Sequence, residues 1–296
     1  MTSATGTPTR RSLPRRLAAS LYRHPRAQLS GLLAAPLGWL VVAYLGSLAL
    51  MLVSAFWRLD SFSGNTITEP GLQNFVTLTE SDVYRNVAIR TVVMAALVTV
   101  TDIILAFPIA YFMARVASPR MRGLLVVSIL LPLWSGYLVK VYAWRLILNE
   151  SGVLNWALGP LGLHGPGYGD PAVWLVMSYL WLPYMILPIY AGLERIPSSL
   201  LEASGDLGAR SGTTFRKVVL PLALPAVAAG SIFTFSLTLG DYITPTLVSG
   251  TQFIGNVVYS NISVNRPLAA AYALVPIVIM IAYLLVARRL GAFKEL

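Results

Sequence analysis

Three ionisable residues lie inside apolar stretches of this sequence, where a charge would act in a low-dielectric setting. Asp102, Lys140 and Asp241 each interrupt a run of mainly hydrophobic residues. An ionisable side chain at the centre of a membrane helix costs about 2.5–3.5 kcal/mol on insertion scales, so such groups usually face a pathway or a partner. Their chemistry would be the attraction or repulsion of a charged solute, or an ion pair that controls a gate.

The residue types needed for covalent or metal-dependent catalysis are nearly absent. The sequence has no cysteine, which excludes disulfides, thiolate metal sites and thiol nucleophiles. Its only histidines, His24 and His164, lie in the N-terminal tail and in a predicted outer loop. An intramembrane serine hydrolase needs a base beside its serine, and neither histidine lies in a predicted span, so a Ser–His pair within the membrane is excluded. The sequence therefore predicts no catalytic residue, no cofactor and no metal site.

The elements that position these residues are predicted to be membrane helices. Hydrophobic residues make up 56% of the 296, charged residues only 11%, and the mean hydropathy is +0.69. Soluble domains average about 25% charged residues, so this composition indicates a chain solvated by lipid. A helix needs about 20 mainly apolar residues to cross the hydrocarbon. Six stretches meet that condition: 32–57, 87–114, 123–148, 172–193, 219–248 and 268–287.

The distribution of basic residues between the predicted loops indicates a direction for the spans. Lys- and Arg-rich loops lie on the cytoplasmic side of a membrane. The N-terminal tail, the links after the second and fourth spans and the C-terminus are basic, whereas links 58–86, 149–171 and 249–267 are poor in positive charge. We therefore expect both termini in the cytoplasm. The net charge of +10 is attributed to this topology rather than to nucleic-acid binding.

The chain is expected to form a tail and one membrane domain. Residues 1–30 are predicted to be a basic cytoplasmic tail, 31–290 a six-helix transmembrane domain and 291–296 a cytoplasmic C-terminus. The apolar run 31–57 is longer than the roughly 7–15-residue core of a secretion signal, and no small-residue cleavage site follows it. We therefore expect an uncleaved first span.

The basic link between the fourth and fifth spans, 194–221, carries signs of helix starts and stops. Ser199 followed by Glu202 predicts a capping box, in which each side chain satisfies a free amide of the first turn. Gly208 predicts a left-handed end to that helix, and a second start follows at Ser211. The pattern predicts two short helices joined by a sharp turn at the cytoplasmic surface. An ordinary amphipathic connector would give the same pattern.

This link resembles the E-A-A loop of ATP-binding-cassette (ABC) importer permeases, whose pattern is E-A-A, three residues, G, nine residues and I-x-L-P. The matching residues are Glu202, Ala203, Ser204, Gly208, Leu220 and Pro221. Ser204 replaces the second alanine and Val218 replaces the isoleucine. The resemblance implies the all-α, six-span fold of a type I ABC importer permease, and a loop that docks into a groove on a cytoplasmic ATPase.

The resemblance also implies partners, because this sequence holds no phosphate-binding G-x-x-x-x-G-K-[ST] loop. Its only lysines are Lys140, Lys217 and Lys294. The implied partners are a dimer of ABC ATPases, a second and unlike permease chain, and a substrate-binding protein outside a prokaryotic plasma or inner membrane. A secondary transporter or channel would explain the spans but not the E-A-A loop.

Segments 71–75, 131–144 and 239–250 resemble the spermidine/putrescine branch of these permeases. The resemblance implies transport of a polyamine. Importers of ferric iron, aminoethylphosphonate, opines and amino-acid-like solutes share much of the same pattern, so these substrates are alternatives.

A polyamine would need carboxylates for its ammonium groups and aromatic faces for cation–π contact. The candidate pathway residues are Asp241, Tyr242, Tyr137, Trp134, Lys140 and Asp102, with Trp181 and Tyr184 as further aromatic faces. Structural roles are open as well. Asp241 could pair with Lys140 or cap a helix broken at Gly240, and Asp102 could bond to a neighbouring helix. The aromatic residues could form an interfacial belt. Lys140 would repel a cation, so a gating or ion-pair role suits it better.

Overall fold

The computed structural model describes residues 25–60 and 62–289, which are mostly helical. Among these residues, five helices are long and apolar enough to cross a membrane, and one bent helix pair is a sixth candidate span. The spans are Leu29–Ser54, Asp82–Val116, Asp170–Glu194, Ser211–Gly240 and Arg266–Arg289, with the bent pair Pro119–Trp134 and Tyr137–Leu148. The predicted all-α membrane fold class is confirmed. By its internal contacts the chain forms two units, residues 1–53 and 54–296.

The described part of the first unit, from Pro25 onward, is an apolar helix. It runs from α2 (Pro25–Trp39) through a π-helical segment, η1 (Leu40–Leu45), into α3 (Gly46–Ser54). From Leu29 onward most of its side chains are exposed. A helix that is apolar all round and unburied is typical of a span that faces lipid. The predicted basic tail, up to residue 24, lies outside the described residues.

The second unit begins with a short hairpin and a helix. Strand β1 (Arg58–Leu59) pairs antiparallel with β2 (Thr66–Ile67), and α4 (Gln73–Glu80) follows. In the turn, a hydrogen bond from the Ser63 hydroxyl holds the pKa of Asp60 below its usual range.

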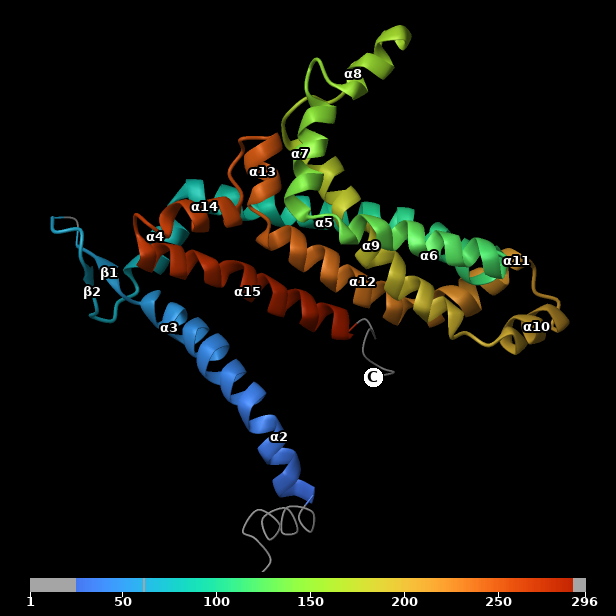
Figure 1. Cartoon of the computed structure of the whole chain (residues 1–296), viewed down its shortest axis with the longest axis horizontal. Coiled ribbons are helices and arrows are strands. Elements are labelled where there is room, and N and C mark those ends of the chain that lie inside the picture. The colour runs from blue at the N-terminus through green and yellow to red at the C-terminus, as the bar shows by residue number, and fades with distance from the viewer. Residues whose placement is uncertain (1–24, 61, 290–296) are drawn as a thin grey trace, which may run out of the picture. The chain divides into compact units, whose positions relative to one another are not determined.

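The core of the second unit is formed by α5 (Asp82–Tyr111), α9 (Asp170–Glu194) and α12 (Leu220–Gly240). These three helices pack side by side (Figure 1). Gly230 on α12 lies so close to α9 that an added Cβ atom would meet the Met185 sulfur at 2.8 Å. Small residues permit this close approach of helices in a membrane, where packing rather than water exclusion holds helices together.

The third span is bent rather than continuous. Helices α6 (Pro119–Trp134) and α7 (Tyr137–Leu148) meet at 94°. At the break, Ser135 has an extended backbone (φ −75°, ψ 142°), which ends the helical hydrogen bonding. Figure 1 shows α7 turning away from the core helices and leading to α8 (Val153–Leu158). The prediction of one helix over 123–148 therefore needs correction, because hydropathy counts apolar residues and does not detect their direction.

The fifth span also ends earlier than predicted. Its helix stops at Gly240, and Asp241 has an extended backbone (φ −73°, ψ 123°). The chain then forms α13 (Ile243–Val248) and α14 (Ile254–Asn261) before the last span, α15 (Arg266–Arg289). The predicted fifth span over 219–248 thus joined a membrane helix to a separate short one.

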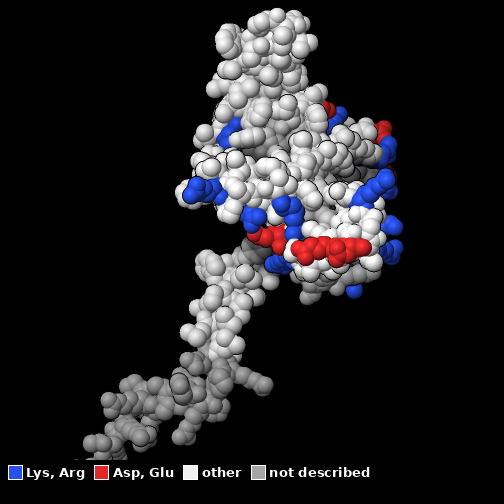
Figure 2. All heavy atoms as spheres, turned by 90° about the vertical axis from the view of Figure 1, so that its right-hand side faces the viewer, with Lys and Arg blue, Asp and Glu red and all other residues white. Residues whose placement is uncertain are grey.

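The remaining short elements lie at the ends of spans or on the connections between them. They are η2 (Phe112–Val116, π-helical), η3 (Gly159–Leu161, 3₁₀), α10 (Ser198–Asp206), α11 (Ser211–Thr214) and η4 (Phe215–Val219, π-helical). Figure 1 places α10 and α11 at one end of the core. Figure 2 views that end and shows many basic groups around an acidic strip. The gathering of positive charge at one end supports the predicted orientation.

Candidate transport and coupling site

Asp241 occupies the break between α12 and α13 and is only 8% exposed. One carboxylate oxygen accepts hydrogen bonds from the backbone amides of Ile243 (2.9 Å) and Thr244 (3.2 Å), which begin α13. The other accepts from the hydroxyls of Thr244 (2.7 Å) and Tyr137 (2.6 Å). Because four donors surround the carboxylate, Asp241 caps α13 by charge-assisted hydrogen bonds. The capping contact that the sequence suggested for Asp241 is therefore formed, although at the start of α13 rather than on the fifth span.

Tyr137, the first residue of α7, joins the broken third span to the broken fifth. Its hydroxyl contacts Asp241 and also lies 2.9 Å from the Thr244 hydroxyl. Its ring stacks on Trp181 of α9, with centroids 5.9 Å apart and planes 10° from parallel. Trp181 in turn lies against Tyr184 at 6.0 Å. These three rings, called the aromatic column below, start beside the Asp241 carboxylate.

Among the described residues, no hydrogen bond, ion pair or ring contact joins Trp134, Tyr242 or Lys140 to this cluster. Trp134, at the end of α6, is 89% exposed. Tyr242 turns to α14 and stacks on Tyr259, with centroids 4.6 Å apart. Lys140 forms no ion pair with any described residue, so the alternative of a pair between Lys140 and Asp241 is not formed.

Asp102 is fully buried in α5. Within the described part of the chain, neither of its oxygens has a hydrogen-bond partner. The same holds for buried polar atoms on the two neighbouring core helices, namely Ser178 Oγ and Trp181 Nε1 on α9 and Thr234 Oγ1 on α12. A buried polar group without a partner costs free energy. The hydrogen bond to a neighbouring helix that the sequence suggested for Asp102 is not present.

The turn after α10 is built around Gly208. This glycine has φ +79°, a conformation that costs other residues free energy because of their Cβ atoms. Its amide donates to the Gly205 carbonyl at 2.8 Å, and the next amide, of Ala209, donates to the Ser204 carbonyl at 3.0 Å. Two such bonds define a Schellman motif, which closes the C-terminal end of a helix. The predicted left-handed stop at Gly208 is confirmed.

The predicted capping box at the start of α10 is wrong. The helix begins at Ser198, and its cap is Pro197, for which no side-chain cap bond occurs among the described residues. Because Pro197, with an extended backbone (φ −63°, ψ 139°), is the cap, the helix starts two residues earlier than a cap at Ser199 would require. Glu202 is left exposed instead of bonding back to the first turn.

Helix α10 presents different residues to the core and to the outside. Leu201 packs against the apolar cluster at this end of α5, α9 and α12. Glu202 and Ala203 are exposed, and Leu207 just after the helix is 89% exposed. Helix α10 thus turns Leu201 toward the core and Glu202, Ala203 and Leu207 outward. Leu220 and Pro221 form the first turn of α12.

One known protein family matches a part of the chain that includes both helix breaks and the Gly208 turn. Residues 87–293 match the family described as binding-protein-dependent transport system inner membrane component. The chain belongs to that family. It is an ABC importer permease, a multi-pass protein of the inner membrane, and the ATPase is a separate partner. Transport that depends on a binding protein also implies a periplasmic partner of that kind.

Two curated relatives match most of the permease. It is 46% identical over 293 residues to the inner membrane ABC transporter permease protein YdcU of Escherichia coli (strain K12), which covers 93% of each chain. It is 30% identical over 260 residues to the spermidine/putrescine transport system permease protein PotB of the same organism, covering 84% of this chain and 92% of the relative.

A solved structure supports the fold. A chain of a bacterial alginate ABC transporter in complex with an alginate pentasaccharide-bound periplasmic protein matches with a TM-score of 0.72. The match covers 93% of the permease and 97% of the other chain at 18% identity. At that identity the likeness concerns architecture and not substrate.

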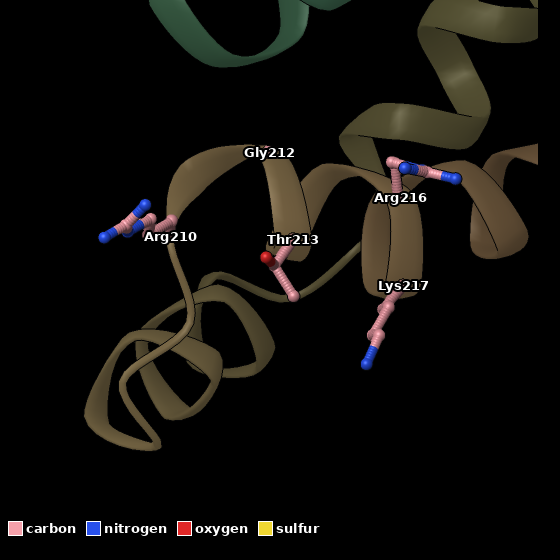
Figure 3. A pocket seen from close by; sticks show the side chains of 5 residues that line it. All are labelled: Arg210, Gly212, Thr213, Arg216 and Lys217. Carbon is pink, nitrogen blue, oxygen red and sulfur yellow. The ribbon is translucent and has the colours of Figure 1, made fainter.

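A basic pocket of the permease lies beside the Gly208 turn. It is lined by Arg210, Gly212, Thr213, Arg216 and Lys217. Figure 3 shows the three cationic side chains pointing away from one another. Because they do not converge, the arrangement is a basic surface and not a site for a single anion.

Sequence reasoning missed a polar contact at the other end of the permease. Asp170, at the start of α9, accepts hydrogen bonds from Ser249 (3.2 Å) and Thr251 (2.8 Å), and Arg90 lies 4.0 Å away. These bonds hold the loop after α13 against α5 and α9. The partners are 79 to 81 residues apart, so no local pattern points to them. Thr244, three residues after Asp241, was also missed, although that spacing is typical of a helix cap.

Proposed function

We propose that this permease imports a polyamine such as putrescine or spermidine. The observation that supports this most is the Asp241 carboxylate beside the aromatic column of Tyr137, Trp181 and Tyr184. The bonds that Asp241 accepts are from neutral donors, so its negative charge is not cancelled by a cation. A negative charge beside aromatic faces in a low-dielectric setting attracts an ammonium group.

The relatives support the same substrate class. PotB proteins about 30% identical to this chain are named for spermidine and putrescine. The name of YdcU, which is more similar in sequence, gives no substrate. Lys140 would repel a polyamine from α7, and we assign it to gating rather than to substrate binding.

We further propose that the exposed face of α10 receives the ATPase. Glu202, Ala203 and Leu207 would enter a groove on the partner, and Gly208 would set the direction of the chain that leaves it. The Ser204 carbonyl accepts the hydrogen bond that closes the turn. Leu220 and Pro221 begin α12, which would move together with α10. ATP-driven closure of two ATPases would shift α10 and reorient the pathway between this chain and a second, unlike permease.

Uptake by the reconstituted transporter tests the substrate. The permease, its partner permease and its ATPase would be placed in proteoliposomes with the cognate binding protein. We expect ATP-dependent accumulation of labelled putrescine or spermidine, and none of ferric iron or aminoethylphosphonate. Accumulation of another solute without any polyamine uptake would overturn the proposal.

A further inference from the structure

Ser204, which stands where the E-A-A pattern has its second alanine, makes a contact that alanine could not make. Its hydroxyl lies 2.9 Å from the hydroxyl of Thr214 at the end of α11, and the pair is partly buried. Its backbone carbonyl meanwhile accepts the Ala209 amide in the Schellman turn. One residue thus closes the end of α10 and ties that end to α11.

Thr214 stands at the start of the fifth span. Helix α11, the π-helical segment η4 and α12 form one continuous helix over Ser211–Gly240. The Ser204–Thr214 pair therefore links α10 directly to the cytoplasmic end of a membrane helix. The backbone bonds of the Gly208 turn close the end of α10 but do not reach α11.

Phe215, the residue after Thr214, packs against the core helix α5. Phe215 packs edge-on against Phe107 and Tyr111 of α5, at 5.6 Å and 5.9 Å between ring centroids. Two of the π-helical segments, η2 after α5 and η4 before α12, lie next to these rings in sequence. Such segments are frequent at functional sites and are places where a helix can adjust.

The two anchors of α10 lie on one helical face. Leu201 and Ser204 are three residues apart, a spacing that puts both on the same side of a helix. Leu201 packs on the core and Ser204 bonds to Thr214, while Glu202 and Ala203 between them are exposed. A force on the exposed face would therefore reach the core through one apolar contact and one hydroxyl pair.

We propose that the Ser204–Thr214 hydroxyl pair is a positioning contact that transmits movement of α10 to the fifth span. This proposal rests on the proposed docking of the ATPase on α10. In the absence of the pair, α10 would still bind the ATPase through its exposed face, but its movement would be passed on less completely.

The test uses the complete transporter with its binding protein in proteoliposomes. The variants are Ser204→Ala, Thr214→Val, the double variant and the exchanged pair Ser204→Thr with Thr214→Ser. The matched control is Thr213→Val, since the Thr213 side chain is exposed and its hydroxyl has no partner among the described residues. Three quantities are measured: ATPase retained on the purified permease, ATP hydrolysis, and solute taken up per ATP.

We expect each single variant to retain the ATPase and to lose about two- to tenfold in uptake per ATP, the range expected for one lost hydrogen bond. The double variant should lose no more than either single one, because both remove the same contact. The exchanged pair should recover, and Thr213→Val should match the native protein.

Native uptake per ATP in both single variants, or losses that add in the double variant, would overturn the positioning role. A native permease that retains no ATPase would instead refute the docking proposal on which it rests. If the single variants failed to reach the membrane, the exchanged pair, which keeps both hydroxyls, would decide: recovery supports the contact and failure contradicts it.

Discussion

The hydroxyl of Tyr137 donates a 2.6 Å hydrogen bond to the carboxylate of Asp241, 104 residues further along the chain. Each residue lies at a helix break. Tyr137 begins α7, just after the break that follows α6, and Asp241 lies in the break between α12 and α13. A broken membrane helix exposes amides that need partners. The bond therefore stabilises one break while joining it to the other, so that the two bent spans are coupled at this point.

Removal of one hydroxyl tests this link. Tyr137→Phe should destabilise the permease by about 1.5–3 kcal/mol, the range for a hydrogen bond to a charged group. The measurement is thermal unfolding in detergent, compared with Tyr142→Phe on the same helix, whose hydroxyl has no partner among the described residues. Equal unfolding temperatures for the two variants would show that the bond contributes nothing.

Neutralising the Asp241 carboxylate distinguishes its capping of α13 from the attraction of its charge for a substrate. Asp241→Asn keeps the size of the side chain and one acceptor for α13, but removes the attraction for an ammonium group. We expect polyamine uptake to fall about tenfold, equivalent to about 1.4 kcal/mol. Thr244→Ser, which keeps the neighbouring hydroxyl, is the control. Unchanged uptake by Asp241→Asn would leave Asp241 with a capping role alone.

Replacement of Asp102 should raise the stability of the permease, whereas replacement of Tyr137 should lower it. Its buried carboxyl lacks a partner in the described chain, so Asp102→Leu removes a desolvation cost and should stabilise the permease by about 1–3 kcal/mol. Thermal unfolding of Asp102→Leu and Asp102→Asn, side by side, measures this. A large loss of stability in the leucine variant would mean that the carboxyl has a partner in the assembled transporter.

Arg115 fixes the end of α9, from which the link 194–221 departs. Its guanidinium donates to the carbonyls of Leu193 (2.6 Å) and Ile196 (2.7 Å), and cations stabilise helix C-termini. Arg115→Met should cost about 1.5–3 kcal/mol of stability. The exposed Arg120, changed to Met, is the matched control. Stability loss of the same size in both variants would contradict a specific capping role.

Features set by local sequence were predictable. The spans follow from the length of apolar runs, and the turn at Gly208 follows from the need for a residue that tolerates positive φ. The capping box failed because two local preferences competed. With Pro197 as its cap, α10 starts two residues earlier than a cap at Ser199 would have required.

Features that depend on three-dimensional packing were not predictable. The 94° bend at Ser135 lies inside an apolar run, and hydropathy carries no information on direction. The Tyr137–Asp241 and Asp170–Thr251 bonds join residues that are 104 and 81 positions apart. The aromatic column could be suggested by residue type, but which rings would join it, and that Trp134 and Tyr242 would not, depends on the fold.

Substitution of Gly208 tests most directly that the α10–α11 turn couples this permease to its ATPase. The space around Gly208 is open, since an added Cβ atom meets nothing within 4 Å, so only the backbone at φ +79° opposes a side chain. Valine should add strain of about 1–3 kcal/mol, whereas asparagine tolerates this conformation. The measurement is ATP-dependent uptake together with the ATPase retained on the purified permease. Gly208→Val should reach the membrane but lose both, with Gly208→Asn close to native. Native uptake and native ATPase retention in Gly208→Val would contradict the coupling role of this turn.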